Sequence, residues 1–149
     1  MSFVYFCLAF VLITCDFVSK ALALKYLKNG VSINLIKNIC ALSYVENTGA
    51  AFGILKNQRI FFLLITILAI AIIGYYFFVS KKNEINKIAL IFIFSGTVGN
   101  FLDRIFRGYV IDFVELTFID FPLFNLADTF LIFGLIWLGF DFVFCDKQN

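Results

Sequence analysis

Two aspartates, Asp112 and Asp128, are the residues of this chain whose chemistry is most informative. They stand in the segments GNFLDRIFRGYVIDF and FPLFNLADTF, within a sequence that is otherwise mostly apolar. A carboxylate held against a membrane is costly, so it usually has a function. In an apolar site, two neighbouring carboxylates cannot both ionise cheaply, and they titrate as a pair. One can then accept a proton from water while the other donates to a carbonyl oxygen, which suits the pair to hydrolysis.

The chain has no histidine, and this excludes several other hydrolytic sites. The HExxH zinc site, the Ser-His-Asp triad and the Cys-His dyad all require that residue. A serine with a lysine base is left, but the Ser-Lys dipeptides at 19–20 and 80–81 place the two groups in poor geometry. The four cysteines lack metal-type spacing, so we expect no metal and no cofactor.

The composition is that of an integral membrane protein. Of the 149 residues, 62% are hydrophobic and 15% are charged, and the mean hydropathy is +0.99. A soluble fold of this size cannot bury so much apolar surface, and an average soluble protein has about a quarter of its residues charged. The net charge of +2, without a basic stripe, predicts no nucleic-acid partner.

Four hydrophobic runs predict an all-α membrane fold of four transmembrane helices, forming one domain over residues 1–149. A span needs about 20 residues, and the shorter runs reach that length if their polar flanks lie in the interface. The first run has no basic segment before it and no small-residue cleavage site, so we expect a retained span rather than a removed signal peptide. The runs are Phe3–Val18, Ile60–Val79, Ile88–Leu102 and Phe130–Phe144.

With four spans, the two long loops at 21–59 and 103–129 lie on the same side of the membrane. The polar residues at the ends of the first, third and fourth runs therefore converge at one face. They are Asp16, Lys20, Asn100, Asp103, Arg104 and Asp128. The opposite face holds both termini and the short loop around Lys81, Lys82 and Lys87. Charge does not decide the orientation, because both the short loop and the first long loop are basic.

Both long loops contain segments with strand character. Ala41–Val45 precedes a turn signal at 46–49, and it predicts a small strand on the membrane surface. Tyr109–Phe118 is rich in β-branched and aromatic residues, and it fits either a strand or an interfacial amphipathic segment. We therefore expect a small β or loop element and an interfacial segment at the polar face.

Three asparagines, Asn47, Asn100 and Asn125, are expected at this face beside the aspartates. An amide donates to one partner and accepts from another, so it can orient a carboxylate or hold a peptide backbone. The alternatives are turn chemistry and helix-end hydrogen bonding for the amides. Asp112 can likewise be a solvated loop residue, and Asp128 a helix cap.

Two acid–base pairs have the i, i+4 spacing that favours contact on one helix face, Asp16 with Lys20 and Asp103 with Arg107. Both are interpreted as structural ion pairs, which makes Asp103 a supporting residue rather than a catalyst. Three glycines are expected to allow tight turns or close helix approach, namely Gly49, Gly99 and Gly108.

The sequence resembles the bacterial lipoprotein signal peptidases, also called signal peptidase II, over nearly its whole length. The resemblance is carried by several ordered motifs: Asp16 with Lys20, NTGAAFG (47–53), GNFLDRIFRGYVIDF (99–113) and FNLADTFLIFG (124–134). The departures are small. Thr97 stands within the Gly96–Asn100 segment, interpreted as a turn, where a small residue is expected, and Thr129 stands where serine is frequent.

The resemblance implies an aspartic endopeptidase that removes the signal peptide of diacylglyceryl-modified prolipoproteins just before the lipidated cysteine. It implies that Asp112 and Asp128 are catalytic. It implies a location in the bacterial cytoplasmic (inner) membrane, in contact with membrane lipid and inhibited by globomycin, with its site at the extracytoplasmic face and both termini cytoplasmic. We expect the chain to act as a monomer. The implied supporting and substrate-binding residues are Asn47, Gly49, Asn100, Asp103, Arg104, Gly108 and Asn125.

Two other classes also use acids in a membrane protein. A proton-coupled transporter places them along a path through the bilayer, whereas span counting gathers them at one face. In a structural or assembly subunit, the acids would only form hydrogen bonds and ion pairs with polar partners.

Overall fold

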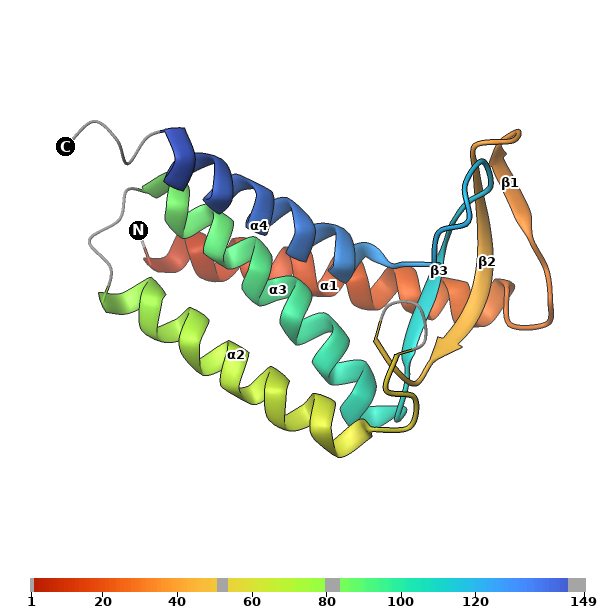
Figure 1. Cartoon of the computed structure of the whole chain (residues 1–149), viewed down its shortest axis with the longest axis horizontal. Coiled ribbons are helices and arrows are strands. Elements are labelled where there is room, and N and C mark those ends of the chain that lie inside the picture. Colours follow the sequence, from red (N-terminus) through yellow and green to blue (C-terminus); the bar gives the residue numbers. More distant parts are fainter. Residues whose placement is uncertain (1, 51–53, 80–83, 145–149) are drawn as a thin grey trace.

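The part of the chain described by the computed structural model, residues 2–50, 54–79 and 84–144, consists of four long helices and a small sheet. The helices are α1 (Ser2–Tyr26), α2 (Arg59–Val79), α3 (Glu84–Phe106) and α4 (Leu126–Phe144). The strands are β1 (Ile33–Ile36), β2 (Cys40–Asn47) and β3 (Val110–Leu116). Figure 1 shows the helices side by side, with the sheet at the end of the bundle where α1 and α3 end and α4 begins.

All four helices are long and apolar enough to cross a membrane, so within the described residues the predicted four-span fold is confirmed. The polar end with the sheet lies opposite the start of α1 and the end of α4 (Figure 1). Two expectations concern residues outside the described ones, namely Lys81 and Lys82 of the short loop and positions 51–53 of the NTGAAFG motif.

The helices continue beyond the apolar runs that predict them. The first run ends at Val18, but α1 extends to Tyr26. The segment Gly96–Asn100, interpreted as a turn, is instead helical, and α3 continues to Phe106. The physical reason is that the polar side chains near these ends find partners inside the bundle, so they do not end the helix. Thr97 also fits the helix, because its Oγ1 donates to the carbonyl oxygen of Ile93 at 2.7 Å.

The sheet is antiparallel, with strand order β1-β2-β3. The strand predicted at Ala41–Val45 lies within β2, and Tyr109–Phe118 contains the strand β3. Strand β1 was not predicted. Ile111 and Phe113 of β3 pack against Ala23 and Leu27, which belong to the end of α1 and the residue that follows it. The extension of α1 thus supports the strand that carries Asp112.

Helices α3 and α4 approach closely because glycines remove side chains from their contact. A Cβ added at Gly134 of α4 would lie 2.6 Å from the carbonyl oxygen of Ala89 on α3. One added at Gly99 of α3 would lie 2.5 Å from Oδ2 of Asp16 on α1, so the close approach expected at Gly99 is confirmed. These contacts set the distance between the elements that carry the polar residues.

The Gly134→Ala variant is expected to lose about 1–3 kcal/mol of stability, since the added methyl group overpacks the α3–α4 contact. Gly74→Ala is the matched control, because a Cβ at this position in α2 would meet nothing within 4 Å. Alanine also favours helix over glycine, so the control should be neutral or slightly stabilised. Thermal unfolding in detergent checks both variants, and equal melting temperatures would contradict the packing argument.

Candidate active site

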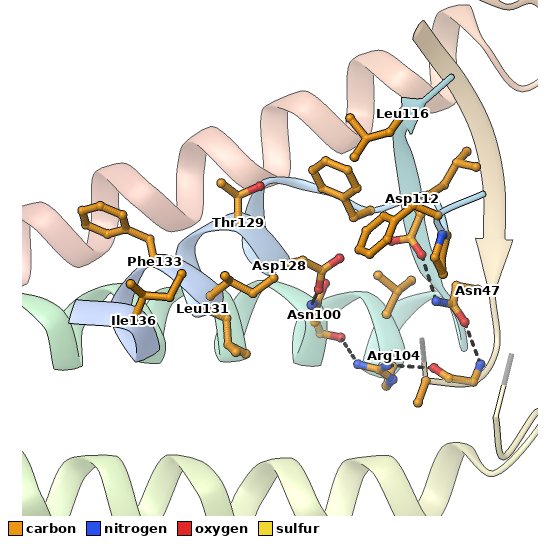
Figure 2. Close-up of a pocket in the computed structure, with 18 residues that line it drawn as sticks. Asn47, Asn100, Arg104, Asp112, Leu116, Asp128, Thr129, Leu131, Phe133 and Ile136 are labelled. Carbon is orange, nitrogen blue, oxygen red and sulfur yellow. Dashed lines mark hydrogen bonds between the residues drawn. The ribbon is translucent and has the colours of Figure 1, made fainter. Parts of the chain in front are cut away.

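Asp112 and Asp128 line one cavity of about 660 Å³. Asp112 comes from the middle of β3, and Asp128 comes from the first turn of α4. Figure 2 shows the two carboxylates among the polar groups at one end of this cavity, while side chains of α4 line its other end. The polar lining residues are Asn47, Asn100, Arg104, Asp112, Asp128 and Thr129.

Asp112 is buried and accepts hydrogen bonds on both of its carboxylate oxygens. Asn47 Nδ2 donates to Oδ2 at 2.9 Å, and Asn125 Nδ2 donates to Oδ1 at 2.7 Å. Register places Asn47 near this carboxylate, because it pairs with Val110 on the neighbouring strand. Burial raises the pKa of Asp112 to about 6, with a smaller contribution from the charge of Asp128, while the two amides oppose the rise. The acid form is therefore populated near neutral pH.

Asp128 and Asn125 form a reciprocal cap at the start of α4. The backbone N–H of Asp128 donates to Asn125 Oδ1 at 3.0 Å, and the backbone N–H of Asn125 donates to Asp128 Oδ2 at 3.2 Å. Asp128 therefore does cap helix α4, as the alternative interpretation of this residue expects. The cap occupies Oδ2, and Oδ1 accepts a hydrogen bond from Asn100 Nδ2 at 2.7 Å. Asn125 contacts both aspartates, so it fixes one relative to the other.

The amide of Asn100 is oriented by Lys20. Lys20 Nζ donates to Asn100 Oδ1 at 3.0 Å, and Asn125 Nδ2 donates to the same oxygen at 3.2 Å. Because an ammonium group only donates, Asn100 must direct its oxygen toward Lys20 and its NH₂ group toward Asp128. The buried cation thereby determines which group Asn100 offers to the carboxylate.

Lys20 also joins the two ion pairs that the spacing predicts. It lies 2.8 Å from Oδ2 of Asp16 and 3.2 Å from Oδ2 of Asp103. Asp103 also pairs with Arg107 and accepts the backbone N–H of Ile111 at 3.2 Å. Lys20 and Asp16 are each 1% exposed, so this is a buried cluster.

Asp16 extends this cluster to α4, because its Oδ1 accepts the backbone N–H of Ala127 at 2.9 Å. The cluster therefore connects α1, α3, β3 and the start of α4. The i, i+4 spacing predicted the two ion pairs, but it did not predict that Lys20 contacts the acids of both pairs. That contact joins residues of α1 to residues of α3, and no local pattern reveals it.

Arg104 and Gly49 hold the turn beside the cavity. Arg104 Nη2 donates to the Gly49 carbonyl oxygen at 3.2 Å, and its guanidinium lies 4.8 Å from the centre of the Phe62 ring. The backbone N–H of Gly49 in turn donates to Asn47 Oδ1 at 2.9 Å. These bonds direct the NH₂ group of Asn47 toward Asp112. Figure 2 shows this chain of contacts from Arg104 through the turn to Asp112.

Three residues of the predicted supporting set do not line the cavity, namely Asp103, Gly108 and the fully buried Asn125. Asp103 points into the buried ion cluster described above. Gly108 lies between α3 and β3 with a φ of +86°, a backbone conformation that favours glycine. Within the described residues, no group of three or more His, Cys, Asp or Glu side chains could hold a metal ion.

The 22 phenylalanines suit an apolar wall, but the sequence analysis did not identify which residues form the wall of this cavity. Helical spacing from Asp128 predicts part of this wall. Positions 132 and 136 follow it at intervals of four on the same helix face. The wall residues are Leu116, Phe121, Pro122, Leu123, Phe124, Leu131, Ile132, Phe133 and Ile136.

Comparisons with known proteins identify the family. A family model described as signal peptidase (SPase) II matches residues 8–144. The lipoprotein signal peptidase of Brevibacillus brevis is 41% identical over 146 residues, which cover 97% of this chain and 98% of that protein. The one from Clostridium tetani is 44% identical over 130 residues, covering 85% and 83%. A solved bacterial membrane enzyme, determined by the in meso method at 2.3 Å resolution, matches with a TM-score of 0.91 and 32% identity, covering 98% of this chain and 90% of that one. The chain therefore belongs to the signal peptidase II family of lipoprotein signal peptidases, and it is a multi-pass membrane protein.

Proposed function

We propose that this chain, acting as one domain, is an aspartic endopeptidase that removes the signal peptide of diacylglyceryl-modified prolipoproteins. It cuts just before the lipidated cysteine, and Asp112 and Asp128 activate the water. One observation carries the proposal: Asn125 contacts both carboxylates at a single cavity, and helix α4 continues that cavity as an apolar wall. The polar end suits a peptide bond, and the apolar end suits acyl chains.

In the first step, water attacks the carbonyl carbon of the residue that precedes the cysteine. The ionised Asp128 accepts a proton from this water, and the protonated Asp112 donates its proton to the carbonyl oxygen. The product is a neutral gem-diol, with Asp128 now protonated and Asp112 ionised. Asp112 is assigned as the acid because burial raises its pKa to about 6.

In the second step, the C–N bond breaks. Asp128 returns its proton to the leaving nitrogen, which becomes the amino group of the lipidated cysteine. Asp112 takes a proton from one hydroxyl group of the gem-diol as the carboxylic acid of the signal peptide forms. Both aspartates thus regain their starting protonation, and no further reactant is needed.

The surrounding polar residues position this pair rather than react. Asn47 and Asn125 hold Asp112, Asn100 holds Asp128, and Arg104 anchors the turn that carries Asn47. Preorganised donors of this kind lower the barrier because they need not reorient as charge develops. The buried cluster around Lys20 connects α3, β3 and the start of α4, which carry Asn100, Asp112 and Asp128.

We further propose that the chain acts as a monomer in the bacterial cytoplasmic (inner) membrane, with its site at the extracytoplasmic face and both termini cytoplasmic. A prolipoprotein is anchored by its signal peptide and its acyl chains, so its cleavage site lies at the membrane surface. The cavity is lined by residues of the sheet end of the bundle, and that end lies opposite the start of α1 and the end of α4 (Figure 1), which supports placing the site and the termini on opposite faces.

Globomycin is expected to compete with the lipidated precursor, because a cyclic lipopeptide offers the cavity both a peptide backbone and an acyl chain. Steady-state cleavage of a lipidated precursor by the purified protein in detergent tests this. The inhibitor should raise KM and leave kcat unchanged. Failure to cleave the precursor at all would refute the proposed function, and a fall in kcat at constant KM would refute the shared site.

The pH dependence should follow the proton on Asp112. Above about pH 6, kcat/KM should fall about tenfold per pH unit, since the acid form that donates to the carbonyl oxygen is lost. The Asn47→Ala variant removes a hydrogen bond that lowers the pKa of Asp112, so its decline should begin at higher pH. A pH–rate profile of both proteins checks this, and a decline displaced to lower pH in the variant would contradict the assignment.

A further inference from the structure

A second cavity, of about 540 Å³, adjoins the first at Asp112. The two cavities share Asn47, Ala50 and Asp112, together with the segment 121–123. Asp112 therefore stands where the two spaces meet. A chain bound across this carboxylate would extend into the first cavity on one side and into the second on the other.

The two cavities differ in their chemistry. The first continues along α4, which is one of the membrane-spanning helices, and its far wall is apolar. The second is formed outside the helices, by the end of β2 and the segments that follow β2 and β3. Its lining includes the ionisable residues Glu46, Lys56, Asp112 and Asp120. One space is suited to lipid and the other to a polar chain.

A lipidated precursor has the same division of polarity on the two sides of its lipidated cysteine. The signal peptide and the acyl chains are apolar, whereas the residues after the cysteine lead into the water-soluble part. We propose that the second cavity is the subsite for the residues directly after the lipidated cysteine, and that its charges favour a basic over an acidic side chain there. This inference rests on the proposed function and adds a preference that the function alone does not require.

The sign of the preference follows from the charges that line the subsite. Glu46 and Asp120 face one ammonium group, from Lys56, whereas Asp112 is proposed to be protonated in the active form and adds no charge. Glu46 accepts a hydrogen bond from the Tyr44 hydroxyl at 3.0 Å, and Lys28 lies 3.5 Å from the same carboxylate oxygen. These contacts lower the pKa of Glu46 and keep it ionised. An incoming lysine is therefore attracted, and an incoming glutamate is repelled.

The test uses three lipidated precursors that differ only in the residue after the cysteine, which is lysine, glutamine or glutamate. The wild-type protein in detergent should cleave the lysine substrate with a kcat/KM about fivefold above that of the glutamate substrate, with glutamine between them. Asp120→Lys should reverse the order. The preference should also shrink as salt is raised, because the subsite is open to solvent.

Glu115→Gln provides the matched control, because Glu115 is an acid of the same sheet that lines neither cavity. This variant should keep the wild-type order. Equal cleavage of the three substrates by the wild type would overturn the proposal, as would an unchanged order in Asp120→Lys. Other outcomes would refute the proposed function itself: the wild type leaves the glutamine substrate uncut, or Asp112→Asn cuts it.

Discussion

Asp112→Asn and Asp128→Asn are each expected to reduce cleavage of a lipidated precursor by about a thousandfold or more. Each substitution removes a group that gives and takes protons in both chemical steps, and general acid–base catalysis contributes about 10²–10⁴-fold for one such group. The loss should appear in kcat, because neither carboxylate is proposed to bind the acyl chains. The measurement is kcat and KM for the purified variants in detergent.

The change from aspartate to asparagine conserves the size of the side chain, so both variants should remain folded. Thermal unfolding and size-exclusion chromatography check this. Glu115→Gln serves again as the control, since it alters an acid outside both cavities and should keep the wild-type rate. Full turnover by either aspartate variant would show that the pair is not the catalyst.

Lys20→Met is expected to give a large loss of stability. It removes the cation between two buried carboxylates, Asp16 and Asp103, and an uncompensated buried charge costs about 3–5 kcal/mol. For a chain of this size, that corresponds to a fall of about 10 °C in melting temperature. The variant should also lose activity, because Asn100 loses the donor that fixes its orientation toward Asp128.

Lys28→Met is the matched control for this loss. Lys28 pairs with Glu46 at 3.5 Å, but both side chains are substantially exposed, and such pairs contribute under about 1 kcal/mol. Thermal unfolding in detergent compares the two lysine variants with the wild type. Equal melting temperatures for Lys20→Met and Lys28→Met would contradict the structural importance of the buried cluster.

Much of the fold can be predicted from the sequence, because the membrane restricts the choices. Apolar runs of sufficient length must be helices, and counting them places the polar ends of the first, third and fourth at one face. The structure agrees, since Lys20 contacts both Asp16 and Asn100, and Asn100 in turn contacts Asp128. The lengths of the helices were less predictable. Polar residues such as Lys20 and Asp103 end a hydrophobic run in the sequence. They do not end the helix when their side chains form an ion pair inside the bundle.

The sequence indicated which residues to expect at the candidate site, but it did not indicate which of them contact one another. Residue type singled out both aspartates and the three asparagines. The sequence did not show that Asn125 contacts both carboxylates, or that Lys20 orients Asn100, since these contacts join residues far apart in the chain. Strand β1 and the second cavity were also missed. The cavity depends on how the segment 121–123 leads into the pairing of Phe124 with Val114 of β3, and short loops carry little periodic signal.

Mass spectrometry of the products from a lipidated precursor tests the central claim most directly. The wild-type protein should release two fragments, a signal peptide with a free carboxyl terminus and a mature fragment that begins at the lipidated cysteine. Asp112→Asn and Asp128→Asn should release neither fragment at comparable times. Cleavage at another bond by the wild type, or the same two fragments from either variant at the wild-type rate, would contradict the account.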